Sequence, residues 1–257
     1  MITSSSNPQM KNIVQLNKKA KARREQGLYV VEGYKMYLEA PEEQIEKIYG
    51  ASHFLEKHPE IRQKHPDLEE VDDRVFAAIS DTQTPQGILC LMRRPRWDIK
   101  RMLEKENPFL MVLEDLQDPG NVGTIFRTAE GAGVDGIILT KNCVDIYNPK
   151  TIRSTMGSIY RVPFFYTDKI EEVLGELMVH DVRTFAAHLN GERDYDREDY
   201  KRGTAFFIGN EGNGLTDDLA NMADRLVKIP MCGQLESLNA AMAAGILMYE
   251  AARQRRM

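Results

Sequence analysis

The chain has 257 residues, of which 42% are hydrophobic and 28% are charged, and this composition is typical of a globular protein with a buried core. No apolar run reaches the roughly 18 residues that a membrane span needs, and the N-terminus carries no secretory signal pattern. The three cysteines form no C-x-x-C pair, and the five histidines show no metal-ligand spacing. We therefore expect a cytoplasmic protein with no membrane contact, no disulfide framework and no metal.

The net charge of −5 argues against a protein that coats nucleic acid nonspecifically, yet basic residues are concentrated in two places. The first cluster contains Lys11, Lys18, Lys19, Lys21, Arg23 and Arg24, and the second contains Arg93, Arg94, Arg96, Lys100 and Arg101. Phosphate binding needs local positive charge and not a basic total. Each cluster therefore predicts either RNA contact or a solvated face or flexible tail.

Strand and helix patterns alternate in the first part of the chain. Short apolar runs predict three strands, at residues 28–31, 45–49 and 87–91, and residues 34–40 predict a helix. This alternation predicts a small α/β domain over residues 1–98. The charged residues that follow predict a linker over residues 99–107, with some helix.

From residue 108 onward the patterns alternate more clearly. Strands are predicted at residues 109–113, 136–139, 184–188, 205–208 and 226–229, and helices at 121–132 and 237–253. The Asp118-Pro119-Gly120 segment predicts a turn before the first of these helices. Strands that alternate with helices predict a parallel sheet covered on both faces, here in a domain over residues 108–257.

The first candidate for chemistry is the helix that begins near Asn121. Its apolar residues recur at helical spacing, so Asn121, Thr124 and Arg127 share the opposite, polar side. Gly120 and Gly123 leave space for a ligand to approach. An arginine in this place can grip a phosphate with two hydrogen bonds, and the alternative is an ion pair with a surface acid.

The second candidate is a glycine-rich loop, Gly209–Gly214, which directly follows the strand at residues 205–208. Ligands bind at the carboxyl ends of the strands in open α/β sheets. Glycines with Asn210 and Glu211 between them suit backbone contact with a cofactor. A plain flexible turn is the alternative interpretation.

The third candidate is Ile229-Pro230-Met231, followed by Ser237-Leu238-Asn239 and a run of small residues. Ser237 is predicted to be the N-cap of the last helix. The small residues allow that helix to pack tightly, either within the subunit or across a dimer. A G-x-G-x-x-G match over residues 131–136 lies after a helix and before a strand, so it predicts a helix C-cap and not a dinucleotide site.

Together, these three segments resemble the SpoU (TrmH-like) family of RNA 2′-O-methyltransferases, within the SPOUT superfamily. The matching residues are Asn121, Gly123 and Arg127, then Gly209, Glu211 and Gly214, then Ile229, Pro230, Met231, Ser237, Leu238 and Asn239. Through its basic start and Val30-Val31-Glu32-Gly33, the N-terminal half is similar to the family's small substrate-binding domain, which has a ribosomal-protein-like α/β fold. The resemblance implies a parallel-sheet α/β fold with a deep trefoil knot, which periodicity alone would not predict.

The resemblance also implies the reaction, a methyl transfer from S-adenosylmethionine to a ribose 2′-hydroxyl, and a homodimer whose sites draw on both subunits. The implied catalytic residues are Arg127, Asn121, Glu211, Ser237 and Asn239. The implied cofactor-binding residues are Gly209, Asn210, Gly214, Ile229, Met231, Leu238 and Leu139. The implied RNA-binding residues are Lys18, Lys19, Lys21, Arg24, Lys150 and Arg153. Arginine is normally protonated, which favours positioning and electrostatic assistance by Arg127 over direct proton removal.

Several alternatives stay open at this point. The chain could be a catalytically silent RNA-binding protein, such as a ribosome assembly factor, or a base methyltransferase from another SPOUT branch. It could also be a tRNA 2′-O-methyltransferase. The additional N-terminal domain favours rRNA over tRNA, because it adds reach toward a folded RNA.

Overall fold

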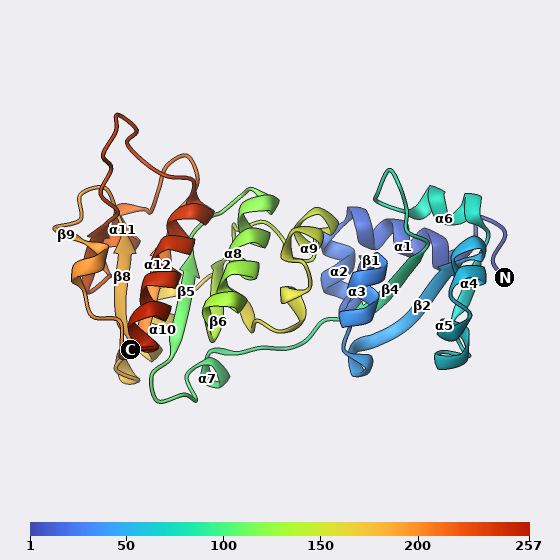
Figure 1. The fold of residues 1–257 in the computed structure, drawn as a ribbon, viewed down its shortest axis with the longest axis horizontal. Helices are drawn as coiled ribbons and strands as arrows, with labels where there is room; N and C mark the ends of the chain where they lie inside the picture. Colours follow the sequence, from blue (N-terminus) through green and yellow to red (C-terminus); the bar gives the residue numbers. More distant parts are fainter. The chain divides into compact units, whose positions relative to one another are not determined.

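The computed structural model describes all residues from 1 to 257, and they form two compact units (Figure 1). Unit 1 comprises Met1–Pro95 and Asp145–Tyr160, and unit 2 comprises Arg96–Val144 and Arg161–Met257. Residues 145–160 thus pack with the first unit, although parts of the second unit precede and follow them in the chain. No helix combines the length and the apolarity that crossing a lipid bilayer would require.

Unit 1 is built on a mixed four-stranded sheet in the order β1-β4-β2-β3. The strands are β1 (Leu28–Glu32), β2 (Ile45–Ala51), β3 (Glu69–Val71) and β4 (Ile88–Arg93). Strand β4 runs antiparallel to β1 and to β2, whereas β2 and β3 are parallel. The three strands predicted in this region are confirmed, and β3 was too short to give a pattern.

The helices of unit 1 include two that the basic start of the chain forms. They are α1 (Pro8–Lys18), α2 (Ala20–Gln26), α3 (Tyr34–Glu39), α4 (Ser52–Lys57), α5 (Pro59–Lys64), α6 (Asp73–Ile79) and α9 (Pro149–Thr155). In α1, Met10, Ile13 and Leu16 are fully buried on one face. The basic start is therefore a packed helical segment and not the flexible tail that was the alternative.

Side-chain contacts tie residues 145–160 into unit 1. Arg23, only 3% exposed, donates from Nε and Nη2 to Asp145 Oδ2 at 2.9 and 2.7 Å. A buried guanidinium is costly unless it is paired, so Asp145 fixes the start of the segment. The ring centroids of Tyr147 and Tyr29 are 4.5 Å apart, and the Arg94 guanidinium lies over the face of the Tyr147 ring.

Unit 2 is built on a seven-stranded sheet in the order β7-β6-β5-β10-β8-β11-β9, and every neighbouring pair is parallel. Its strands are β5 (Phe109–Leu113), β6 (Gly136–Thr140), β7 (Phe164–Thr167), β8 (Arg183–Ala187), β9 (Arg193–Asp194), β10 (Thr204–Ile208) and β11 (Arg225–Lys228). All residues of β5 and β10 are buried, as expected for central strands covered on both faces. The predicted parallel sheet is confirmed.

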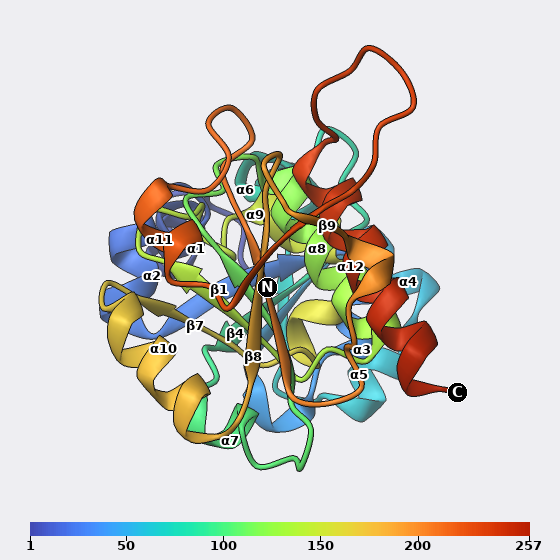
Figure 2. The same cartoon turned by 90° about the vertical axis from the view of Figure 1, so that its left-hand side faces the viewer.

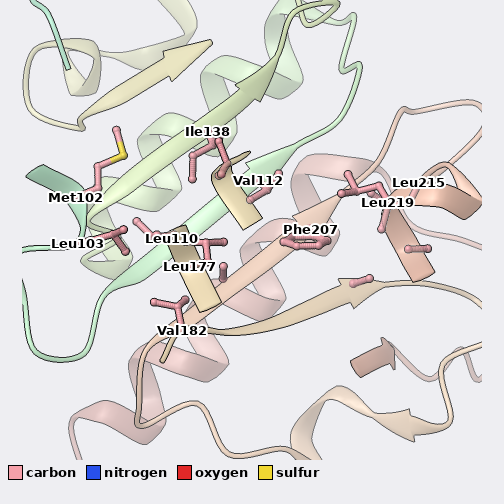
Figure 3. Close-up of a cluster of buried hydrophobic side chains, with 14 residues drawn as sticks. Met102, Leu103, Leu110, Val112, Ile138, Leu177, Val182, Phe207, Leu215 and Leu219 are labelled. Carbon is pink, nitrogen blue, oxygen red and sulfur yellow. The ribbon is translucent and has the colours of Figure 1, made fainter. Parts of the chain in front are cut away.

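Helices cover both faces of this sheet (Figure 2). They are α7 (Ile99–Met102), α8 (Pro119–Ala132), α10 (Ile170–Val179), α11 (Asp217–Asn221) and α12 (Ala240–Arg255). Helices α8 and α12 pack together on one face. On the other face, Val112 and Phe207 of the sheet form one core with Leu177 of α10 and Leu219 of α11 (Figure 3).

The ends of α8 differ partly from the prediction. The helix begins at Pro119, and Asp118 is its N-cap, with its carboxylate accepting from Asn121 N at 2.8 Å. The Asp118-Pro119-Gly120 segment is therefore not a separate turn, because proline is favoured in the first turn of a helix. At the other end, Gly133 caps the helix at φ +78°, which confirms the predicted C-cap.

Candidate active site

The three candidate segments follow the carboxyl ends of strands in one parallel sheet. Strand β10 lies beside β5 with Ile208 opposite Leu113, so the residues after each strand emerge at the same edge. Strand β11 lies in the same sheet, with β8 between it and β10. The loops that follow β10 and β11 extend from this end of the sheet (Figure 2). Ligands collect at such an edge in open α/β sheets.

Three of the expected catalytic residues form one chain of hydrogen bonds. Asn121 Nδ2, in the first turn of α8, donates to Glu211 Oε1 at 3.0 Å. Asn239 Nδ2 donates to Asn121 Oδ1 at 2.9 Å. The amide of Asn121 is thereby held at both ends by residues from two different loops.

Glu211 also accepts hydrogen bonds from the backbone. Gln117 N and Asp118 N donate to its two carboxylate oxygens at 3.2 and 3.1 Å. Partial burial raises the pKa of Glu211, but the hydrogen bonds from Asn121 and from the backbone outweigh it, so the pKa lies below its ordinary value. Glu211 is therefore ionised at neutral pH, with its oxygens occupied by donors. The two backbone donors could not be predicted from the sequence, since main-chain N–H groups leave no residue signature.

Asn239, and not Ser237, is the N-cap of the last helix. Its Oδ1 accepts from Ala241 N at 2.9 Å and from Met242 N at 3.3 Å, and the helix begins at Ala240. Ser237 is exposed and makes no hydrogen bond. The predicted cap and helix start at Ser237 are therefore wrong. Serine and asparagine are both good caps, so residue type alone did not distinguish them.

Arg127 lies on the polar side of α8, six residues and nearly two turns after Asn121. It is exposed, whereas Val122 and Phe126 of the same helix are fully buried. The structure gives the Arg127 guanidinium no hydrogen bond and no ion pair. The alternative of an ion pair with a surface acid is therefore wrong, and all five guanidinium N–H groups are available.

The glycine-rich loop is closed by its own backbone. Asn210 and Gly214 exchange two backbone hydrogen bonds of 2.9 Å, and Gly214 has φ +71°. A Cβ on Gly209 would lie 2.1 Å from the carbonyl carbon of Gly214, so only glycine allows this closure. The Asn210 side chain is used inside the protein, because its Nδ2 donates to Asp115 O at 2.7 Å. The loop is thus a closed turn held by hydrogen bonds at Asn210 and Gly214.

The loop between β11 and α12 has the opposite character. No hydrogen bond engages a backbone N–H or C=O group of residues 229–238, and the loop projects away from the sheet (Figure 1). Ile229, Met231 and Leu238 are half-buried at its two ends. Unpaired donors and acceptors beside apolar side chains suit a ligand with a polar nucleoside and an amino-acid part, as S-adenosylmethionine has. Leu139, by contrast, is completely buried in β6, so its side chain is not available to a ligand.

The expected RNA-binding residues all lie in unit 1, whereas the site described above belongs to unit 2. Four exposed residues lie around the α1–α2 junction: Lys18, Lys19, Lys21 and Arg24. The other two lie on α9, where Lys150 is exposed and Arg153 pairs with Asp81 at 2.8 Å. Residues 145–160 thus bring their basic side chains into the same unit as the basic N-terminal helices.

Two family profiles match the chain. The SpoU rRNA Methylase family matches residues 108–249, which contain every residue of the hydrogen-bonded site. The MRM3-like substrate binding domain matches residues 7–90, which form most of unit 1. The two matches together span nearly the whole chain.

Similar proteins agree with these profiles. An uncharacterised tRNA/rRNA methyltransferase of Synechocystis is 33% identical over 98% of this chain and 93% of its own length. The 23S rRNA (guanosine(2553)-2′-O)-methyltransferase RlmP of Bacillus subtilis is 32% identical over 70% of each chain. The crystal structure of the SpoU methyltransferase AviRb of Streptomyces viridochromogenes with AdoMet superimposes with a TM-score of 0.89, at 25% identity, over 97% of this chain and 98% of that one.

Proposed function

Because the chain belongs to the SpoU rRNA methylase family, we propose that it transfers the methyl group of S-adenosylmethionine to a ribose 2′-hydroxyl of ribosomal RNA. The observation that carries the proposal is the hydrogen-bonded chain from Asn239 through Asn121 to Glu211. Its middle residue, Asn121, lies on the helix that also carries the unpaired Arg127. The names of the relatives support the ribose and the ribosomal target, since RlmP methylates a 2′-oxygen of 23S rRNA. S-adenosylmethionine, when bound, supplies a methyl group made electrophilic by its sulfonium.

The side chains of the site fit a positioning mechanism. Glu211 is ionised and its oxygens already accept from Asn121 and two backbone N–H groups, so we assign it to orienting Asn121 and not to taking a proton. The exposed, unpaired Arg127 guanidinium can hold a phosphate next to the reacting ribose through two hydrogen bonds. A hydroxyl is a poor nucleophile until its proton is being removed, and a fixed cation beside it favours the developing negative charge.

We assign the cofactor to the unpaired backbone of residues 229–238 and to the Gly209–Gly214 loop, with Ile229, Met231 and Leu238 providing apolar contact. The protein then aligns two reactants and needs little covalent chemistry of its own. The homodimer is also proposed. Its support is the outer surface of α12, where Met242 and Tyr249 are 60% and 48% exposed.

The reaction is tested by incubating the full chain with S-adenosylmethionine carrying a labelled methyl group, and with rRNA or tRNA from cells that lack the gene. We expect label in rRNA. Label in tRNA alone would overturn the ribosomal target, and no label in either RNA would support the catalytically silent alternative.

Arg127→Ala is the first variant to test. We expect it to lower kcat by about 100-fold or more while its fold and thermal unfolding are unchanged, because the side chain is exposed and unpaired. Arg197→Ala is the matched control, since Arg197 is an exposed arginine in the same unit but outside the site. Equal losses in the two variants, or unfolding of Arg127→Ala, would contradict the assigned role.

A further inference from the structure

Asp115 has an unusual backbone conformation at the edge of the site. Its φ is +53°, and only two other residues besides glycine, Met156 and Asp181, have positive φ in this structure. The left-handed region is unfavourable for residues with a Cβ, although aspartate tolerates it better than most. Asp115 lies two residues after the end of β5, directly before the Leu116–Asp118 segment that leads into α8.

The Asp115 side chain binds the end of the neighbouring strand. Thr140 Oγ1 donates to Asp115 Oδ1 at 2.6 Å, and Asn142 Nδ2 donates to Oδ2 at 3.1 Å. The Asp115 N–H in turn donates to Thr140 Oγ1 at 2.9 Å. Both carboxylate oxygens are therefore engaged with β6 or the turn that follows it.

The Asp115 carbonyl oxygen binds the glycine-rich loop, because it accepts from Asn210 Nδ2 at 2.7 Å. Asn210 directly precedes Glu211. Two and three residues after Asp115, Gln117 N and Asp118 N donate to the Glu211 carboxylate. Asp115 thus links the ends of β5 and β6 to Asn210 directly, and to Glu211 through the backbone of residues 117 and 118.

We propose that Asp115 is a positioning residue for methyl transfer, whose left-handed turn and carboxylate hold the 117–118 backbone and the Asn210–Glu211 pair in the geometry that orients Asn121. This inference rests on the proposed function, because the reaction whose kcat is measured is the proposed methyl transfer. Asp115 acts through Glu211 and Asn121, because its carboxylate is occupied by Thr140 and Asn142.

Three substitutions distinguish the effect of the left-handed backbone at Asp115 from the effect of its carboxylate contacts. Asp115→Ala loses the carboxylate contacts and keeps a Cβ at positive φ, so kcat should fall by about tenfold or more. Asp115→Gly loses the contacts but adopts this φ freely, so the loss should be smaller. Asp115→Asn tolerates the φ and keeps an acceptor for Thr140, so it should lose least.

The matched controls are Asp181→Ala and Asp181→Gly, because Asp181 has φ +52° but lies before β8, at the amino end of that strand. A second readout is the pKa of the Glu211 carboxyl, followed by ¹³C NMR titration. It should rise in Asp115→Ala, as the donors Gln117 N and Asp118 N move away, and stay at the wild-type value in both Asp181 variants.

Unchanged kcat and unchanged Glu211 pKa in Asp115→Ala would overturn the proposal. Equal losses of kcat in Asp115→Ala and Asp181→Ala, in proportion to lost thermal stability, would also overturn it. The NMR titration needs no RNA and no turnover. If the wild-type chain methylated no RNA, the proposed function would fail, while the shift in the Glu211 pKa would still decide whether Asp115 positions Glu211.

Discussion

The loops that follow β10 and β11 lie at the same end of one sheet, yet their backbones are satisfied in opposite ways. The Gly209–Gly214 loop is closed by two hydrogen bonds between Asn210 and Gly214 and is tied to Asp115. Residues 229–238 have no backbone hydrogen bond. Backbone groups that the protein leaves unpaired must be satisfied by water or by a ligand. The first loop is therefore formed by the protein alone, and we infer that the second takes its final form around the cofactor.

Between the two loops, the larger effect is expected where the closed loop would be forced open. Gly209→Ala places a Cβ 2.1 Å from the Gly214 carbonyl carbon, so the loop and Glu211 must shift. We expect kcat to fall by about 100-fold, because small displacements of a catalytic site have effects of that size. The free energy of unfolding should fall by about 1–3 kcal/mol. Steady-state kinetics and denaturant unfolding measure the two effects.

Gly233→Ala is the matched control in the open loop. A Cβ at Gly233 would meet no atom within 4 Å, so the free energy of unfolding should change by less than about 0.5 kcal/mol. Equal destabilisation by the two substitutions would show that the loops do not differ as described.

A smaller effect is expected for the carboxylate that joins the closed loop to α8. Glu211→Gln removes the charge that strengthens the hydrogen bonds from Asn121, Gln117 and Asp118. Such bonds are worth about 1.5–3 kcal/mol, so kcat should fall by about tenfold or somewhat more. Glu192→Gln, at an exposed glutamate outside the site, should leave kcat unchanged.

The pH dependence of stability gives a second comparison of Glu211→Gln with the wild-type protein. The folded-state pKa of Glu211 lies below its ordinary value of 4.5. The contribution of Glu211 to stability is therefore present above pH 4.5 and is lost as the pH falls through the lower, folded-state pKa. The free energy of unfolding, measured with urea, should fall less steeply below pH 4.5 in Glu211→Gln than in the wild type. Parallel curves would contradict the assigned hydrogen bonds.

The smallest effect is expected at the end of the open loop, where Asn239 caps α12. Asn239→Ala removes the cap and the bond to Asn121, and should lower the free energy of unfolding by about 0.5–2 kcal/mol. Ser237→Ala should leave stability unchanged, since Ser237 makes no hydrogen bond. Thermal unfolding compares the two variants, and a larger loss for Ser237→Ala would restore Ser237 as the cap.

Local patterns accounted for much of unit 2. The buried runs of β5 and β10 and the helical spacing of Val122 and Phe126 are properties of short segments, so the sequence predicts them directly. The residues that form the hydrogen-bonded chain were found through motif resemblance. Their bonds could not be predicted, because Asn121 and Glu211 lie 90 residues apart.

Long-range contacts explain what the sequence did not predict. Residues 145–160 join unit 1 through the pair formed by Arg23 and Asp145, which are separated by 122 residues and leave no local pattern. The role of Asp115 was also missed. Its importance follows from a backbone angle and from its bonds to Thr140 and Asn210, and neither is visible in residue type.

The identity of the methylated atom tests the proposed ribose methylation most directly. Labelled rRNA is digested with nucleases and the products are examined by mass spectrometry. We expect a nuclease-resistant dinucleotide carrying one additional methyl group on the ribose, and its absence when Arg127→Ala replaces the wild-type protein. A methyl group on the base, or an equal yield from Arg127→Ala, would contradict ribose methylation at this site.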